Sequence, residues 1–330
     1  MYGKGTWNRT KKTLNYLQNL RSRPVKQGNR VLSGQNFMDG DAYTSGFNDV
    51  IAGLHSDTGK WVGIGSTEMA GNTFSGKNLI NANRLIAYSK SGAIVTVNWN
   101  FSNPFVASGD VYNRADGDLR KLTAPNGALR AQWTAQLDEV VKMMRHFKAQ
   151  GVVVVWRPFQ EMNGNWFWWG RRDEAAFGAL WRDMVLYLRQ KDAWQNVLWC
   201  YSPNNSDGGS PNVANYATYY PGATLADTIG VTNYRDDTIV PDYAWLAAQG
   251  KPLWITEGFR SIDKSTGSAA DNTRILRAIR SKYPAICGVV AWHSWRTNDS
   301  WNRMALRHNN RATELLTDPW IINRDEIPAL

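Results

Sequence analysis

The chain has 330 residues, of which 43% are apolar and 20% charged, so it can bury a large core and is not a disordered protein. No apolar stretch is long enough to cross a bilayer, and a net charge of +10 suggests nucleic acid as one candidate partner. The excess charge is confined to residues 1–30, which hold eight basic and no acidic residues, whereas the remaining 30 basic residues face 28 acidic ones. We interpret 1–30 as a solvated basic helical segment packing on the rest of the chain, with attraction to anionic cell-wall material as the functional alternative. We therefore expect neither a nucleic-acid nor a membrane partner.

Short apolar, β-branched runs alternate with segments of helical periodicity along the whole chain. The runs predict strands at 31–34, 61–64, 93–98, 152–157, 197–201, 228–232, 253–256 and 288–292. Apolar residues at steps of three or four predict helices over 129–147, which Gly151 ends, over 177–188 and over 275–279. Eight strands alternating with helices at this length predict one (β/α)₈ barrel, a single domain over 1–330. An open doubly wound sheet is the rival, but no glycine-rich phosphate loop follows the first strand.

The cysteines and histidines give no support to a metal or redox site. Cys200 and Cys287 are the only two cysteines, too far apart for a CxxC motif, and we expect them to be unpaired at opposite ends of the barrel. The four histidines form no close pair, so we expect no metal and no cofactor.

Aromatic residues are unusually frequent, with 17 Trp and 13 Tyr, more than we expect a core to need. Flat aromatic faces pack against the apolar C–H faces of sugars. Two segments without regular periodicity, 101–124 and 202–211, follow the third and fifth strands and so belong to the face where such barrels keep their active sites. The composition favours a carbohydrate ligand.

Two carboxylates follow predicted strands. Glu161 comes after the fourth strand and Glu257 after the seventh, so both are expected at the mouth of the barrel, facing one another. Cleavage of an acetal needs such a pair, because one group protonates the leaving oxygen while the other attacks the anomeric carbon. A lone Glu at a strand end usually pairs with an arginine at the barrel rim, but two in matching positions beside many tryptophans favour catalysis.

The segment 156–170, WRPFQEMNGNWFWWG, closely resembles the acid/base motif of glycoside hydrolase family 26. The resemblance extends over nearly the whole chain: 30–34 resembles the first strand of the family, 220–234 the sixth-strand region, 254–257 the nucleophile strand and 290–292 the eighth strand. It implies a retaining glycosidase without a metal. Most members degrade β-1,4-mannan, and a minority act on β-1,3-xylan or mixed-linkage β-glucan.

Position by position, the resemblance makes Glu161 the acid/base and Glu257 the nucleophile. Tyr234 would hydrogen-bond the nucleophile, and Trp166 and Trp292 would form the walls and floor of the sugar site beside the cleaved bond. It also implies a secreted enzyme, although the chain begins Met1-Tyr2-Gly3-Lys4 without the apolar stretch of a signal peptide. We expect a monomer whose partner is its polysaccharide substrate.

We expect Gln160, Asn100, Arg157 and Trp169 to bind substrate. At the first two of these positions the sequence departs from the mannanase pattern. Gln160 and Asn100 stand where mannanases usually carry histidines that contact the reacting sugar. Two imidazoles replaced by amides in one subsite suggest a different sugar, which favours an endo-β-1,3-xylanase. The alternatives are an endo-β-1,4-mannanase, a mixed-linkage β-glucanase and a non-catalytic carbohydrate-binding protein, although the last would have no need of both Glu161 and Glu257.

Overall fold

The computed structural model describes residues 4–22, 30–114, 117–205, 212–235, 238–258, 269–297 and 300–330. Parallel strands form a closed barrel, as the sequence predicts, in the order β1/β2, β3, β4, β5, β6, β7, β8 and β9, with β9 pairing both with β8 and with β1 and β2. Their bounds are β1 Val31–Leu32, β2 Gly34–Phe37, β3 Ile64–Gly71, β4 Ile94–Phe101, β5 Val154–Arg157, β6 Val197–Tyr201, β7 Thr228–Asn233, β8 Leu253–Gly258 and β9 Ile286–Ala291. Three further strands are β10 Trp295–Thr297, β11 Ser300–Asn302 and β12 Ile321–Ile322.

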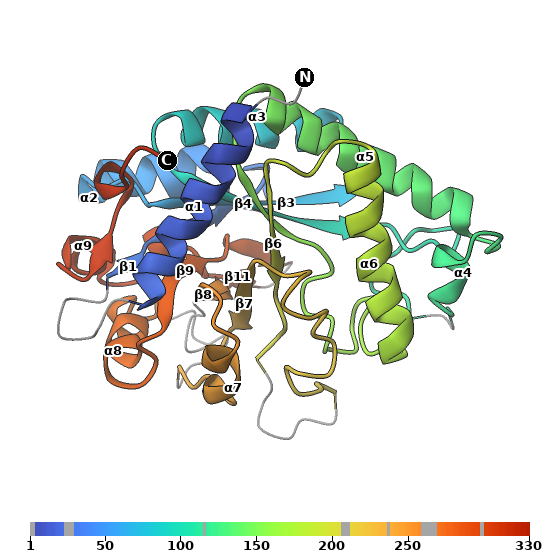
Figure 1. Cartoon of the computed structure of the whole chain (residues 1–330). Helices are drawn as coiled ribbons and strands as arrows, with labels where there is room; N and C mark the ends of the chain where they lie inside the picture. Colours follow the sequence, from blue (N-terminus) through green and yellow to red (C-terminus); the bar gives the residue numbers. More distant parts are fainter. Residues whose placement is uncertain are drawn as a thin grey trace.

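Helices connect the strands and cover the outside of the barrel (Figure 1). They are α1 Lys4–Ser22, α2 Leu54–Thr58, α3 Gly76–Lys90, α4 Arg120–Thr123, α5 Arg130–Ala149, α6 Glu174–Gln190, α7 Tyr243–Ala248, α8 Thr273–Lys282 and α9 Ala312–Thr317. The predicted helices over 129–147, 177–188 and 275–279 correspond to α5, α6 and α8. Their apolar stripes face the barrel, where Leu137, Met144 and Phe177 are completely buried.

The structure corrects the bounds of several predicted strands. Ser33 separates β1 from β2, and β9 begins at Ile286, before the predicted start. The largest difference concerns β3, which starts at Ile64, where the predicted strand ends, and continues through Gly65, Ser66 and Thr67 to Gly71. This segment lacks an apolar run because part of its polar side faces the interior near the mouth of the barrel. Segment 101–124 also contains the short helix α4.

Two apolar clusters make up the core. The larger one fills the layer between the barrel and its helices, and the smaller one lies inside the barrel, where Leu32, Ile94 and Trp254 meet. Cys200 and Cys287 are both free and buried, as predicted, but they belong to the same interior cluster. The expectation that they lie at opposite ends of the barrel is therefore wrong, because Cys287 is the second residue of β9 and does not precede the strand.

More of the tryptophans are buried in the core than we expected from the sequence. At least seven of the 17 are fully buried. These are Trp99, Trp133, Trp156, Trp168, Trp169, Trp181 and Trp254. Most of their indole N–H groups donate to oxygens of other core segments; Trp168 donates to the carbonyl of Phe101 at 2.8 Å, and Trp181 to that of Leu225 at 3.0 Å. The number of tryptophans is therefore weaker evidence for a sugar site than we expected, because an indole can be buried wherever its N–H finds an acceptor.

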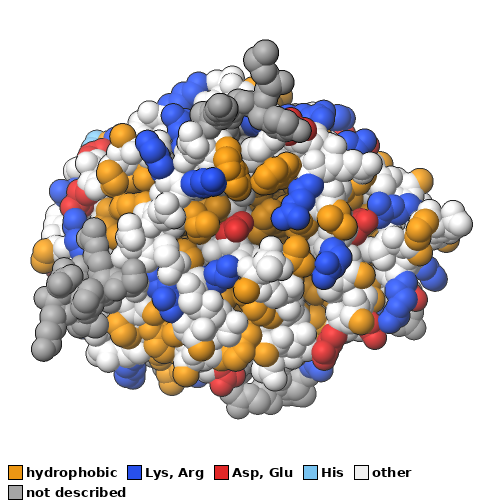
Figure 2. Space-filling model, viewed as in Figure 1, with side chains coloured by type: hydrophobic (Ala, Val, Ile, Leu, Met, Phe, Trp, Pro, Cys, Tyr) orange, Lys and Arg blue, Asp and Glu red, His pale blue; other side chains and the backbone are white. Residues whose placement is uncertain are grey.

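The helix α1 lies across the barrel strands in the foreground of Figure 1. Its Leu17 and Leu20 join the interior cluster, and Thr10 donates to the carbonyl of Gln195 at 2.6 Å. On this face, Lys and Arg side chains are scattered among apolar and acidic ones and are not gathered in one stripe (Figure 2). Within the described ranges, no helix combines the length and apolar character needed to cross a membrane.

Candidate active site

A cavity of about 670 Å³ lies at the mouth of the barrel, beyond the carboxyl ends of the strands. Its lining combines carboxylates, amides and aromatic rings. Its lining includes Glu68, Asn100, Gln160, Glu161, Trp166, Asn204, Tyr234, Glu257, Trp292, His293, Trp295 and Arg296. The cavity thus brings together Glu161 and Glu257 with five of the other seven residues that the sequence selected.

Glu161 is held by a strained turn directly after β5. Its φ is 58°, in the left-handed region that non-glycine residues rarely adopt, and Phe159 two residues earlier has a φ of 52°. The turn is fastened to the loop after β6, because the Glu161 N–H donates to the Ser202 carbonyl at 2.8 Å and the Asn163 side chain donates to the Asn204 carbonyl at 2.9 Å. These contacts maintain a conformation that aims the carboxyl group into the cavity.

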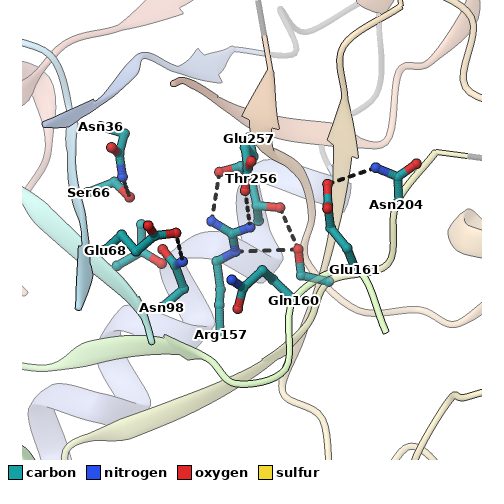
Figure 3. Close-up of polar contacts among 12 residues, drawn as sticks. Asn36, Ser66, Glu68, Asn98, Arg157, Gln160, Glu161, Asn204, Thr256 and Glu257 are labelled. Atoms are coloured by element: carbon teal, nitrogen blue, oxygen red, sulfur yellow. Dashed lines mark hydrogen bonds and ion pairs between the residues drawn. The ribbon is translucent and has the colours of Figure 1, made fainter. Parts of the chain in front are cut away.

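The Glu161 carboxyl group accepts two hydrogen bonds. Trp166 donates from Nε1 to Oε2 at 2.6 Å, and Asn204 donates from Nδ2 to Oε1 at 2.7 Å (Figure 3 shows the second contact). Burial, followed by the negative charge of Glu257, raises the pKa of Glu161 to about 7, and the two donors act in the opposite direction. A carboxyl group with this pKa can both deliver and recover a proton near neutral pH.

Glu257 is the fifth residue of β8 and therefore lies within the strand rather than after it. Tyr234 donates from its hydroxyl to Oε1 at 2.7 Å, and Arg157 donates from Nη2 to Oε2 at 3.0 Å (Figure 3 shows the arginine contact). Burial raises the pKa of Tyr234 well above its usual value, so the phenol keeps its proton and acts as a donor. A carboxyl group held by a cation and a phenol has a fixed orientation, as an attacking group must have.

Arg157 and Trp169 need a correction, because both side chains are completely buried. Arg157 lies beneath the cavity, where Nη1 also donates to the Thr256 carbonyl at 3.2 Å. Trp169 donates from Nε1 to the Gln160 carbonyl at 3.0 Å and stacks on Phe167. Neither side chain presents a surface to a sugar, so their expected substrate-binding role does not fit the structure. They position Glu257 and the turn that carries Glu161.

Gln160 and Asn100 both line the cavity and contact each other, because Gln160 donates from Nε2 to Oδ1 of Asn100. Gln160 is only 2% exposed, and its buried Oε1 has no hydrogen-bond partner among the residues that the structure describes. The two amides therefore form one coupled pair. A buried acceptor that lacks a partner is costly unless a ligand supplies a donor.

The structure adds two residues that sequence reasoning missed. Glu68, on β3, accepts a hydrogen bond from Asn98 at 2.9 Å, and burial followed by the charge of Glu257 raises its pKa to about 7. The predicted second strand ended at Ile64, so Glu68 did not lie at the end of a predicted strand and was not selected as a candidate. Asn204 lies in the segment 202–211 that we expected at the active-site face, but nothing in the sequence distinguished it from other amides there.

Trp166 and Trp292 lie at the cavity wall; Trp166 is half-buried and Trp292 is 7% exposed. Among the described residues, no group of three or more His, Cys, Asp or Glu side chains is arranged to hold a metal ion.

Comparison with known proteins identifies relatives over nearly the whole chain. Residues 5–326 match the model of the family described as Glycosyl hydrolase family 26. The "Mannan endo-1,4-beta-mannosidase A and B" of Caldalkalibacillus mannanilyticus is 30% identical, with 96% of this chain covering 61% of that protein. The "Mannan endo-1,4-beta-mannosidase" of Bacillus subtilis is 28% identical over 96% of this chain and 86% of its own. The solved structure of a Bacillus subtilis mannanase superimposes with a TM-score of 0.81 at 25% identity, covering 97% of this chain and 94% of that one.

Proposed function

Because this chain belongs to glycosyl hydrolase family 26, we propose that it is an endo-β-1,4-mannanase that retains configuration at the anomeric carbon. The observation that carries the proposal is the contrast between the two carboxyl groups. Glu161 has a pKa raised to about 7, whereas Glu257 is paired with the Arg157 guanidinium and accepts a hydrogen bond from Tyr234. Two carboxyl groups in environments this different are suited to acid and nucleophile respectively.

In the first step, a carboxylate oxygen of Glu257 attacks the anomeric carbon while Glu161 gives its proton to the glycosidic oxygen, so the C–O bond breaks and the leaving sugar departs as an alcohol. In the second step, Glu161, now a carboxylate, takes a proton from water. The resulting hydroxide attacks the anomeric carbon and releases Glu257. Both enzyme carboxyl groups return to their starting protonation states.

The expectation of β-1,3-xylan is not supported, because the relatives that cover nearly the whole chain are named for mannan. As two separate departures from the mannanase pattern, Gln160 and Asn100 would suggest a different sugar. Since one amide donates to the other, they amount to a single coupled replacement and carry less weight for a different sugar. Secretion and the monomeric state stay predictions, and so does the role of 1–30 as an accessory segment of one catalytic domain.

A panel of polysaccharides tests the proposal: β-1,4-mannan, β-1,3-xylan, mixed-linkage β-glucan and β-1,4-xylan, each assayed for new reducing ends. We expect the highest rate on mannan, with internal cleavage visible as a rapid fall in viscosity. Proton NMR of the first product should show the β-anomer before mutarotation. Glu161→Gln and Glu257→Gln should abolish activity on mannan, whereas Glu174→Gln, at an exposed position on α6, should not change it. A first-formed α-anomer would contradict retention, and a preference for xylan would contradict the substrate.

A further inference from the structure

His293 is a cavity residue that the two-step mechanism leaves unused. It lies two residues beyond the end of β9, is 6% exposed and lines the cavity. Its ring lies between two tryptophans, with centroid distances of 5.0 Å to Trp292 and 6.0 Å to Trp295. Since β9 is the fourth strand from β5 in either direction around the eight-membered ring, His293 and Glu161 belong to opposite sides of the mouth.

The orientation of the imidazole is fixed by a chain of buried polar groups. Nδ1 of His293 lies 2.8 Å from Oδ1 of Asn36, and Asn36 donates from Nδ2 to the Ser66 hydroxyl at 3.0 Å (Figure 3 shows the second contact). Both partners are completely buried. Because an amide oxygen only accepts hydrogen bonds, Nδ1 must carry the proton, and a neutral imidazole then has a lone pair on Nε2.

The surroundings keep this imidazole neutral. Burial lowers the pKa of His293 to about 3, opposed by the negative charge of Asp41 in the loop after β2. The other charged side chains that line the same cavity are Glu68 on β3, Glu161 after β5, Glu257 on β8 and Arg296 on β10. Asn36 also helps to keep the ring uncharged, because its amide is neutral. A carboxylate at this position would favour the charged imidazolium and turn Nε2 into a donor. Among the described residues, Asn36 is the only hydrogen-bond partner of the ring.

We propose that His293 is a specificity-determining residue that accepts, through Nε2, a hydrogen bond from a hydroxyl of the sugar one unit beyond the reacting sugar on the glycone side. The inference rests on the proposed function, because the direction of the chain follows from the acid/base. Glu161 protonates the leaving oxygen, so the leaving part of the substrate extends toward β5 and β6, and the glycone extends toward β9, β2 and β3. Asn36 holds the ring toward β2, away from the strand that carries Glu257, and Trp295 offers the neighbouring apolar surface.

The tautomer can be tested in the free enzyme, independently of any substrate. In protein labelled with ¹⁵N in histidine, the Nδ1 signal of His293 should have the shift of a protonated nitrogen and Nε2 that of an unprotonated one at pH 5 to 8. The signals are assigned by their loss in His293→Phe. A protonated Nε2 would overturn the proposal. In the inactive variant Glu161→Gln, adding mannotetraose should move the Nε2 signal, and an unmoved signal under saturation would also overturn it.

Kinetics test which sugar the imidazole contacts. His293→Phe keeps a flat ring but removes the acceptor, so kcat/KM on mannotetraose should fall on the order of tenfold or more. Activity on an aryl β-mannoside, which places one sugar in the reacting subsite, should change little. The matched control is His55→Phe, since His55 stacks on Trp61 outside the cavity and the change preserves that stacking. Equal losses on both substrates would show that His293 does not contact the second sugar.

Asn36→Asp separates a hydrogen-bonding role from simple packing. It should charge the imidazole and lower kcat/KM on mannotetraose more at acidic than at alkaline pH, a dependence that loss of packing alone would not produce. An unchanged pH profile would contradict the role of Asn36. If the wild-type enzyme cleaves another glycan of the panel and not mannan, the proposed substrate is wrong. The role of His293 is then still tested by its tautomer and by the loss of kcat/KM in His293→Phe on oligosaccharides of that glycan.

Discussion

Arg157 donates from Nη2 to Oε2 of Glu257 at 3.0 Å from a position with no solvent exposure. The same guanidinium donates to the Thr256 carbonyl, so it holds both the backbone and the side chain of the nucleophile strand. When one partner of a buried ion pair is removed, the charge of the other is left uncompensated, which costs far more than the pair itself contributes. The arginine is thus a positioning residue whose effects should extend to both activity and stability.

Arg157→Met should lower kcat/KM on mannan on the order of a hundredfold and the free energy of unfolding by about 3–5 kcal/mol. Arg157→Lys should lie between this variant and the wild type, because an ammonium restores the charge but not the planar fork. Steady-state kinetics and denaturant unfolding measure the two effects, with Arg182→Met, at an exposed position on α6, as the control. If Arg157→Met were as stable and active as the wild type, this positioning role would be wrong.

Trp166→Phe should move the alkaline limb of the kcat/KM profile to higher pH. Activity falls as Glu161 loses its proton near its pKa of about 7, and the indole N–H of Trp166 favours the carboxylate form. Removing that donor therefore raises the pKa of Glu161 further. Trp181→Phe is the matched control, because the N–H of Trp181 donates to the Leu225 carbonyl and its ring does not line the cavity. A shift toward lower pH would contradict the assignment.

Glu161→Ala should separate substrates by their leaving groups. An aryl mannoside whose phenol leaves without protonation should lose far less activity than mannan, whose sugar leaving group needs the proton. Added azide should speed turnover of the activated substrate and give a β-mannosyl azide, because the small anion replaces the water that Glu161 normally activates. Equal losses on both substrates would exclude Glu161 as the acid.

Glu161→Gln should stabilise the fold at alkaline pH. The pKa of this 8% exposed carboxyl group is raised from 4.5 to about 7 on folding, so the folded state binds more protons than the unfolded one between these values. Stability is therefore lost as pH rises through this interval, because the buried carboxyl group must ionise. Urea unfolding at pH 8 should show a gain of about 1–3 kcal/mol for the variant that disappears near pH 4. Glu174→Gln should show no such pH dependence.

Gln160→Leu and Asn100→Leu should each lower kcat/KM on mannan, and the double variant should lose less than the two single effects combined. The reason is that Gln160 donates to Asn100, so removing either amide already breaks their shared contact. Residues in direct contact typically couple by about 0.5–3 kcal/mol in such a cycle. Strictly additive losses would mean that the two amides act independently on the sugar.

The sequence by itself determined the barrel and the position of the two carboxylates, Glu161 and Glu257, at its mouth. Apolar runs mark most of the barrel strands and alternate with helical stripes, and both signals are local, since each depends on the spacing of neighbouring residues along the chain. The motif around Glu161 is likewise continuous. Glu257 needed only its apolar strand and the family resemblance, so local patterns were sufficient to place it at the mouth of the barrel.

Only the tertiary structure decided which side chains surround these carboxylates. Glu68 was missed because β3 turns a polar side inward and has no apolar run there, and Asn204 because its contact with Glu161 joins two separate loops. Arg157 and Trp169 belong to the same sequence motif as Glu161, yet their side chains are buried in the core. The pairing of Gln160 with Asn100 and the contact of His293 with Asn36 join residues 60 and 257 positions apart. Such contacts are set by closure of the barrel, which brings strand ends together irrespective of their distance along the chain.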